Sequence, residues 1–136
     1  MYDVAELIQE YSKNPVNNYE MLDADVVYQE WNPICGDGIV VYLKIEKNKL
    51  KNFSFSGDTS MVTTAAVSML AEEIIAYDIE KILSLDYNFV KEELGLEVSP
   101  RRERSAVLGL LATRNAIHEY KKDWILDDFD DLIEED

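Results

Sequence analysis

One loop of the sequence combines a thiol and a carboxylate at a spacing that could bind a metal ion or handle sulfur. Residues 32–38 read Asn-Pro-Ile-Cys-Gly-Asp-Gly, so Cys35 and Asp37 lie two positions apart in a segment whose composition favours a tight turn. A thiolate and a carboxylate can both coordinate a transition metal, whereas a cationic neighbour would lower the pKa of the thiol and make it a nucleophile. The same pattern also fits a turn in which the cysteine packs as a small apolar residue.

Few other side chains suggest chemistry. The single histidine, His118, is far in sequence from residues 32–38, and we expect it at the surface or half-buried. A cation cluster near a predicted helix start could bind an anion, lower the pKa of a nearby thiol or neutralise acidic surroundings; it comprises Arg101, Arg102 and Arg104. No acid-base pair, nucleophile triad or phosphate-binding loop is recognisable, so the chain is not expected to be an enzyme.

Strand-like segments surround the loop. They cover residues 25–31, 39–46 and 49–55, and Lys47 and Asn48 are expected at the tip of a hairpin between the last two. In residues 39–46 every second side chain is strongly apolar, while the positions between them are mixed. This alternation indicates an antiparallel sheet that is covered on one side.

Helical periodicity dominates the rest of the chain. A short helix is predicted over residues 4–11 and a longer one over residues 60–77, and the others are predicted over residues 79–85, 88–94 and 99–120. Gly95 is expected to cap the fourth helix, while Ser99 and Pro100 are expected to start the last one. The order of elements predicts an α+β domain, with a three-stranded antiparallel sheet and helices packed on one face.

Composition excludes several classes of function. The chain has 136 residues, is 47% apolar and contains one cysteine, so one domain without an intramolecular disulfide is expected. A net charge of -15 disfavours binding to nucleic acid or anionic lipid, so no nucleic-acid or membrane partner is expected. The sequence lacks an apolar stretch of about 20 residues, and its first residues do not resemble a signal peptide, which predicts a cytoplasmic protein.

The last 14 residues form a distinct acidic segment. We expect a domain over residues 1–122 and a C-terminal tail over residues 123–136, because the tail contains eight carboxylates and no basic residue. Its apolar residues Ile125, Phe129 and Leu132 have helical spacing, which predicts an acidic amphipathic helix. Such a helix could bind a partner, pack on its own domain or pack on a second copy of the chain.

Four segments follow one another at a characteristic spacing between residues 11 and 120. They are residues 11–17, Tyr-Ser-Lys-Asn-Pro-Val-Asn; residues 32–37, Asn-Pro-Ile-Cys-Gly-Asp; residues 55–70, which begin Phe-Ser-Gly-Asp-Thr-Ser; and residues 104–108, Arg-Ser-Ala-Val-Leu. Together they resemble the IscU/SufU/NifU-type iron-sulfur scaffold family. The resemblance implies the α+β fold already expected from the pattern of strands and helices. It also implies a role in iron-sulfur cluster assembly.

The resemblance places serines where two of the family's three ligand cysteines should be. Ser60 and Ser105 stand at the second and third cysteine positions, and Arg104 stands where IscU-like members have histidine. In the family, as the resemblance implies, three cysteines and an aspartate hold a nascent cluster or a zinc ion, and cysteines accept sulfur from a cysteine desulfurase. Only Cys35 and Asp37 carry this pattern over, and they are the predicted metal ligands.

The ligand count argues against a tightly held metal within one subunit. Iron-sulfur clusters and structural zinc sites use about four ligands, mostly thiolate or imidazole. Even with Asp58 added to Cys35 and Asp37, one subunit offers two or three ligands. We therefore interpret Ser60 as the N-cap of its helix and Ser105 as a first-turn residue, neither of them a ligand.

Two functions remain open at this point. In the first, the chain is an atypical scaffold that acts through Cys35 and Asp37 as a sulfur acceptor or as a binder of labile iron, zinc or cluster. A cluster shared between two copies of Cys35 would then require a homodimer. In the alternative, the chain binds no metal and is a docking or regulatory module for a cysteine desulfurase or another iron-sulfur assembly protein.

Overall fold

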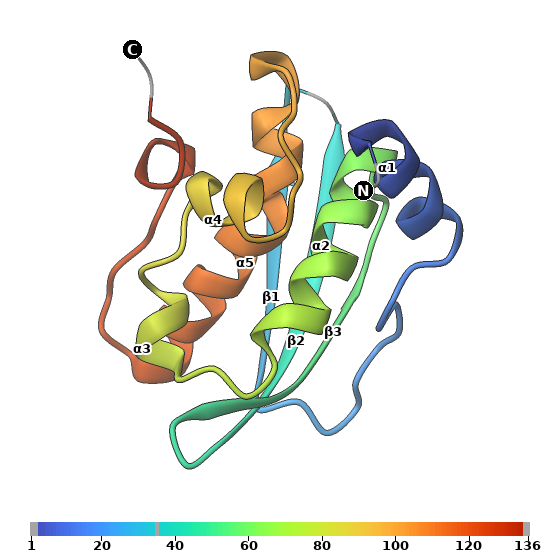
Figure 1. Cartoon of the computed structure of the whole chain (residues 1–136). Helices are drawn as coiled ribbons and strands as arrows, with labels where there is room; N and C mark the ends of the chain where they lie inside the picture. Colours follow the sequence, from blue (N-terminus) through green and yellow to red (C-terminus); the bar gives the residue numbers. More distant parts are fainter. Residues whose placement is uncertain (1–2, 35, 135–136) are drawn as a thin grey trace.

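A three-stranded antiparallel sheet forms one layer of the computed structural model, which describes residues 3–34 and 36–134 (Figure 1). The strands are β1 (Val26–Asn32), β2 (Asp37–Glu46) and β3 (Lys49–Ser56), and β2 lies between the other two. In β2 the side chains of Ile39, Val41 and Leu43 are fully buried, whereas those between them are half-buried. The predicted α+β fold with one covered sheet face is therefore confirmed.

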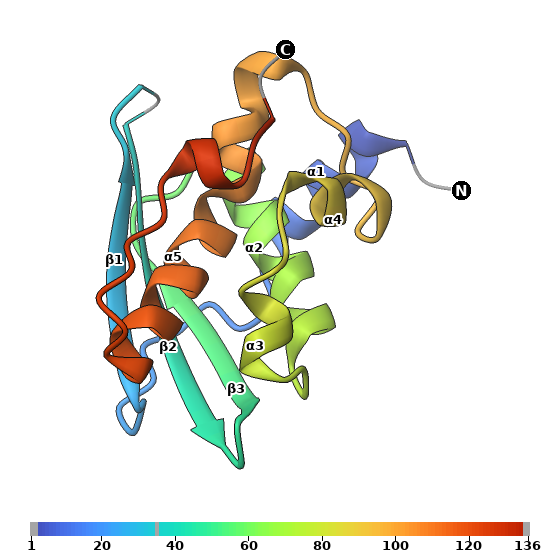
Figure 2. The ribbon, with the colours of Figure 1, turned by 90° about the vertical axis from the view of Figure 1, so that its left-hand side faces the viewer.

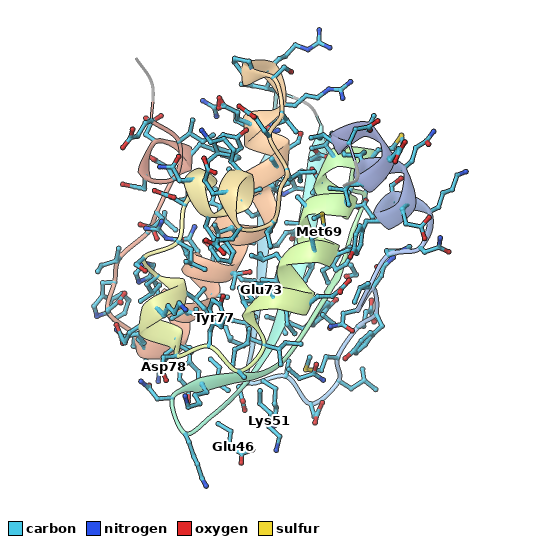
Figure 3. All side chains as sticks on the ribbon, in the orientation of Figure 1. Glu46, Lys51, Met69, Glu73, Tyr77 and Asp78 are labelled. Atoms are coloured by element: carbon cyan, nitrogen blue, oxygen red, sulfur yellow. The ribbon has the colours of Figure 1, made fainter. Side chains whose placement is uncertain are left out.

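The hairpin between β2 and β3 turns at the residues predicted from the sequence. Lys47 and Asn48 have φ angles of 54° and 64°, the left-handed conformation that a two-residue hairpin turn requires. The side chains of Glu46 and Lys51 form an ion pair at 2.5 Å beside this turn (Figure 3). The turn and its alternating strands fix which face of β2 meets the helices.

The helices lie on the same side of the sheet, as two views at right angles show (Figures 1 and 2). Their bounds are α1 (Val4–Lys13), α2 (Met61–Ile74), α3 (Ile79–Ile82), α4 (Tyr87–Glu92) and α5 (Glu103–Lys121), with 3-10 turns at Pro100–Arg102 and Phe129–Asp131. Among the described residues, no helix is both long and apolar enough to cross a membrane.

The two central helices, α2 and α5, cross closely because one of them carries a glycine. A Cβ atom at Gly109 would lie 2.7 Å from Cγ2 of Val67, which is shorter than any normal contact. Val67 is itself buried in the core. The glycine therefore sets the approach of α5 to α2, and this approach brings their N-terminal ends together.

The end of α2 differs from the sequence prediction. The helix was expected to continue to Tyr77, but it ends at Ile74, and Ala76 adopts a φ of 81°. The reason is pairing with the sheet: the N–H of Ala76 donates to the carbonyl of Leu50, and the N–H of Leu50 donates to the carbonyl of Tyr77. The Tyr77 hydroxyl still donates to Glu73, at 2.8 Å (Figure 3).

The start of the last helix also differs in detail. Pro100 begins a 3-10 turn rather than the α-helix itself, which starts at Glu103. Ser99 precedes this turn, but its side chain makes no capping hydrogen bond. Gly95 has a φ of 72°, in agreement with its predicted capping position after α4.

The acidic tail packs on the rest of the chain through two apolar residues. Phe129 and Leu132 are 9% and 2% exposed and belong to the main hydrophobic core. The expected amphipathic helix was wrong: within residues 123–134 only Phe129–Asp131 is helical, and Ile125 is 54% exposed. The tail therefore packs on its own domain, which is one of the three alternatives expected from the sequence. The domain boundary at residue 122 stays a prediction.

Candidate functional site

Three segments that are far apart in sequence meet at one end of the sheet. Asp37 is the first residue of β2, Ser60 is the N-cap of α2, and Ser105 lies in the first turn of α5. The loop before α2 lies very close to the start of β2. A Cβ atom at Gly57 would be only 2.5 Å from the carbonyl oxygen of Gly38, so this approach requires a glycine. The structure thus brings together the retained aspartate and both serines that the resemblance places at cysteine positions.

The carboxylate of Asp37 is 1% exposed and is surrounded by hydrogen-bond donors. Its Oδ1 accepts from the backbone N–H of Ser60 at 2.5 Å. Its Oδ2 lies within reach of three hydroxyl donors, at 3.2 Å from Ser60 Oγ, 2.9 Å from Thr63 Oγ1 and 3.0 Å from Ser105 Oγ. We call this group, Asp37 with Ser60, Thr63 and Ser105, the Asp37 cage.

The helix-start positions expected for the two serines are confirmed, but they describe only part of the contacts of these residues. Ser60 caps α2 through the N–H of Thr63, at 3.3 Å, and Ser105 lies in the first turn of α5. Sequence reasoning did not find that both hydroxyls also contact Asp37, and it did not single out Thr63. The i, i+3 spacing of Ser60 and Thr63 at a helix start was the available signal, because both side chains then lie on one face of the first turn.

The predicted ligands can be placed only in part. Cys35 lies outside the described residues, so its role as a ligand or sulfur acceptor stays a prediction. Asp37 is at the site, but both of its oxygens already accept hydrogen bonds. Asp58 is exposed, and its part in the site is a backbone one: its carbonyl accepts from the N–H of Gly38 at 3.1 Å.

These residues do not fit a resident iron-sulfur cluster or zinc ion. Within residues 3–34 and 36–134 no group of three or more histidine, cysteine, aspartate or glutamate side chains could hold a metal. The serine and threonine hydroxyls act as proton donors to Asp37, and hydroxyl oxygens are poor ligands for the soft metals that thiolates bind. Cys35 is the only thiol in the sequence.

A groove opens beside the Asp37 cage between α1 and the first turns of α2 and α5. Ser60 and Ser105 line it together with Arg101, Arg102 and Ile34, the residue that precedes Cys35 in the chain. The arginine cluster of the sequence is divided, because the guanidinium of Arg104 stacks 4.7 Å above the ring of Phe129. Arg101 and Arg102 therefore remain at the groove, together with the carboxylates of Asp3 and Glu6.

One further polar residue is buried next to Asp37. Asn32 pairs with Asp37 across β1 and β2 and is fully buried. Neither polar atom of its side-chain amide has a hydrogen-bond partner in the described part of the chain. The amide adds a buried donor and a buried acceptor to this end of the sheet. From the sequence, Asn32 was considered only as the first residue of the motif in residues 32–37.

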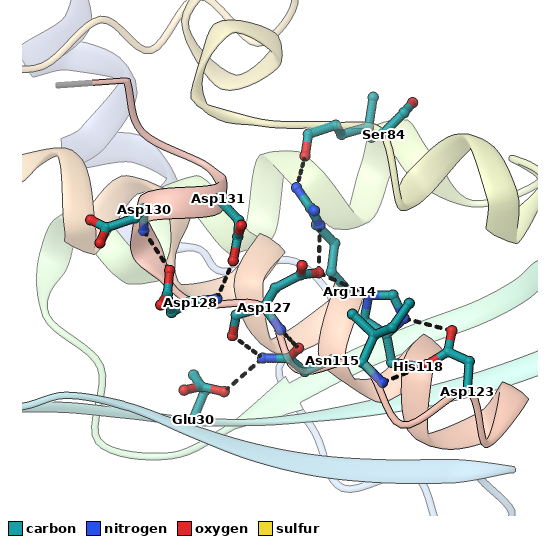
Figure 4. A network of polar contacts seen from close by, with 12 residues as sticks. Glu30, Ser84, Arg114, Asn115, His118, Asp123, Asp127, Asp128, Asp130 and Asp131 are labelled. Atoms are coloured by element: carbon teal, nitrogen blue, oxygen red, sulfur yellow. Dashed lines mark hydrogen bonds and ion pairs between the residues drawn. The ribbon is translucent and has the colours of Figure 1, made fainter. Parts of the chain in front are cut away.

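A second polar network holds the tail near the other end of α5 (Figure 4). His118 lies between two carboxylates, with Nδ1 at 2.8 Å from Asp123 and Nε2 at 2.9 Å from Asp127. Asp127 also accepts from Nε of Arg114 at 3.0 Å, and its backbone is paired with the side chain of Asn115. His118 is 7% exposed, so the expectation of a surface or half-buried residue was wrong: the tail covers it.

The Asp123 contact makes the stability of this network depend on pH. The hydrogen bond from His118 holds the pKa of the Asp123 carboxyl below its ordinary value of 3.8, and the N–H of Ile125 contributes less. A carboxyl whose pKa falls on folding stabilises the folded state above its unfolded-state pKa, and this contribution is lost as pH falls through the folded-state pKa. The stability difference between wild type and Asp123→Ala should therefore be present near pH 5 and shrink below about pH 4.

Urea unfolding of both proteins over this pH range measures the difference. Asp130→Ala is the control, because Asp130 lies in the same tail and is exposed. A difference for Asp123→Ala that stays constant down to about pH 2 would contradict the expected linkage.

Comparisons of structure agree with the fold described above. The N-terminal domain of a NifU-like protein from Brucella abortus superimposes with a TM-score of 0.72 and 18% identity, over 87% of this chain and 94% of that chain. The SufU protein of Fervidobacterium islandicum gives a TM-score of 0.69 and 21% identity, over 82% and 94% of the two chains. At these identities the likeness establishes the fold.

Comparisons of sequence are more specific. The chain is 33% identical to the scaffold protein IscU of Thermotoga maritima over 60% of this chain and 57% of that protein. It is 28% identical to IscU 1 of Archaeoglobus fulgidus over 85% and 75%. It is 32% identical to the zinc-dependent sulfurtransferase SufU of Bacillus subtilis over 62% and 56%. The chain thus spans a little over half the length of the Thermotoga and Bacillus relatives.

The profile of the NifU-like N-terminal domain matches residues 3–125, which is nearly all of the described chain. This match includes α1, the whole sheet, the Asp37 cage and α5. The chain belongs to the NifU-like N-terminal domain family of iron-sulfur cluster assembly scaffolds.

Proposed function

We propose that this protein accepts sulfur from a cysteine desulfurase on the thiol of Cys35 and holds no cluster or zinc ion of its own. The observation that supports the absence of a cluster or zinc ion is the Asp37 cage. In it, hydroxyl donors occupy the positions of two ligand cysteines. The proposed sulfur transfer is supported by family membership, by the retained cysteine and by the relative from Bacillus subtilis, which is named a zinc-dependent sulfurtransferase. The proposal differs from that name in leaving out the zinc ion.

The proposed step is a sulfur transfer between thiols. The Cys35 thiol gives its proton to water, and the thiolate attacks the outer sulfur of a persulfide on the desulfurase. A new S–S bond forms on Cys35, the S–S bond of the desulfurase breaks, and the desulfurase cysteine leaves as a thiolate. No external oxidant or reductant is consumed. The product is an anionic persulfide on Cys35.

Two arginines lie at the groove beside the Asp37 cage. Arg101 and Arg102 line the groove that also contains Ile34, the neighbour of Cys35 in sequence. Asp3 and Glu6 line the same groove, so its lining is balanced in charge, in contrast to the chain as a whole with its net charge of -15.

Transfer to Cys35 can be measured directly because the chain has a single cysteine. We expect that incubation without oxygen with a purified cysteine desulfurase and cysteine, followed by alkylation and mass spectrometry, finds one added sulfur atom on the peptide with Cys35. Cys35→Ser should abolish this product, and a chelator should leave it unchanged. Absence of the persulfide while the desulfurase is active would refute the proposal.

A docking or regulatory role is the second candidate, and one surface favours it. Trp124, Ile125 and Leu126 are 95%, 54% and 73% exposed, although they are consecutive apolar residues. They lie between Asp123 and Asp127, which the polar network holds in place. Apolar side chains flanked by carboxylates suit a protein partner with an apolar pocket and a basic rim, and the charge of the chain disfavours a second copy of itself.

The same desulfurase distinguishes the two candidates. Docking through the tail predicts that Trp124→Ala with Leu126→Ala weakens binding, while Cys35→Ser leaves binding unchanged and the protein forms no persulfide. Leu22→Ala is a matched control, since Leu22 is an apolar residue that is 96% exposed outside the tail. Sulfur transfer predicts the persulfide on Cys35 whatever the tail variant does to affinity.

A further inference from the structure

The Asp37 cage joins segments that a metal ion would otherwise have to join. Along the sequence, Asp37 is separated from Ser60 by 23 positions, from Thr63 by 26 and from Ser105 by 68. The four residues nevertheless meet around one carboxylate at the ends of β2, α2 and α5. Contacts that close such long loops have to compensate a large loss of chain entropy.

The cage is complete as a hydrogen-bonded group. Each oxygen of Asp37 has at least one donor. Thr63 and Ser105 are 0% and 5% exposed, and Ser60 is half-buried. Thr63 also lies 3.2 Å from the backbone carbonyl of Ser105, which links α2 to α5 directly. A carboxylate that is buried with several donors is stable without a cation, because the donors replace the lost water.

A metal ion at the same place would have to break this arrangement. The hydroxyls of Ser60, Thr63 and Ser105 all lie within hydrogen-bond distance of Asp37 Oδ2, the oxygen that would bind the ion. If these hydroxyls turned away from Asp37 to face a metal ion, they would still be protonated. Protonated hydroxyl groups bind zinc and iron weakly.

The spacing of the cage, in contrast, suits a metal site. Ligands at about 2.0–2.3 Å from a tetrahedral zinc ion lie roughly 3.5 Å from one another. The oxygens of Ser60 and Ser105 are 3.2 and 3.0 Å from Asp37 Oδ2, which needs only a small expansion. The chemistry of the donors disfavours a zinc ion or an iron-sulfur cluster, while their positions do not.

We infer that the Asp37 cage is a metal-free cross-link that holds β2, α2 and α5 together, and that Ser60 and Ser105 are the two residues that keep it from binding a metal. The inference rests on the part of the proposed function that says the protein holds no cluster or zinc ion, and it does not depend on sulfur transfer to Cys35. The persulfide measurement and the zinc measurement can therefore fail separately.

The double variant Ser60→Cys with Ser105→Cys tests the inference through metal content. Refolded with zinc chloride under reducing conditions and then desalted, the variant should retain close to one zinc ion per chain, and a chelator should lower its melting temperature. The wild type treated in the same way should retain no zinc, and its melting temperature should not respond to the chelator.

Three results would overturn the inference: stoichiometric zinc in the wild type, a chelator-sensitive melting temperature of the wild type, or a folded double variant that retains no zinc. If the double variant does not fold, Ser105→Ala provides the test. It removes one donor without adding a thiol, and it should lower the melting temperature of the metal-free protein. An unchanged melting temperature for Ser105→Ala would show that the cage is not a cross-link.

Discussion

Replacing Asp37 by alanine is expected to lower the free energy of unfolding by about 3 to 5 kcal/mol. The change removes the shared acceptor of three hydroxyls and one backbone N–H at a site that is 1% exposed. Water cannot replace the carboxylate fully, because Thr63 and Ser105 are buried as well. Equilibrium unfolding in urea measures the loss, and it should be the same with and without a chelator.

Asp58→Ala is the matched control for this prediction. Asp58 belongs to the same loop region, but it is exposed and contributes to the site through its backbone carbonyl. Its replacement should cost less than about 0.5 kcal/mol. Asp37→Asn should fall between the two alanine variants, because the amide keeps one acceptor. Equal losses for Asp37→Ala and Asp58→Ala would contradict the role given to the Asp37 cage.

Replacing Arg114 by methionine is expected to cost about 3 kcal/mol and to loosen the tail. Nε of Arg114 lies 3.0 Å from Asp127, and Nη1 lies 2.9 Å from the backbone carbonyl of Leu85. The two charged side chains are only 12% and 9% exposed, so methionine leaves a buried carboxylate without its arginine partner. Urea unfolding measures the loss in the free energy of unfolding. Faster proteolytic cleavage within the tail, at positions beyond residue 122, reports that the tail is released.

Lys121→Met serves as the control for the buried pair. Lys121 is also a cation on α5 with one carboxylate partner, Glu80, at 2.6 Å, but these side chains are 30% and 57% exposed. Such a pair contributes between zero and about 1 kcal/mol, because water screens it. The account of the tail fails if Lys121→Met costs as much as Arg114→Met, or if Arg114→Met leaves protease resistance unchanged.

The sheet and its covered face were predictable from local patterns. The alternation in residues 39–46 has a period of two, and the hairpin tip at Lys47 and Asn48 sets the pairing of β2 with β3. Helix ends were less predictable, because tertiary contacts decide them. Ala76 leaves the helical conformation to pair with Leu50, a residue of β3 that no local window connects with α2.

The site was predictable in its composition but not in its contacts. The sequence identified Asp37, Ser60 and Ser105 through the family resemblance, and helix capping explained part of the role of Ser60. The serines can donate to Asp37 because α2 and α5 cross closely. This crossing is a tertiary feature that local sequence patterns do not predict. His118 was placed wrongly for a similar reason, since the tail that buries it had been expected to form a helix.

The account depends most on the claim that one chain of this protein holds no cluster and no zinc. The direct measurement is the iron, zinc and acid-labile sulfide content of the native protein, purified without oxygen and analysed as a monomer. We expect amounts well below one metal ion per chain, because the cage presents hydroxyl donors where thiolate ligands would be needed. A stoichiometric iron-sulfur cluster or zinc ion in the monomer would contradict the account.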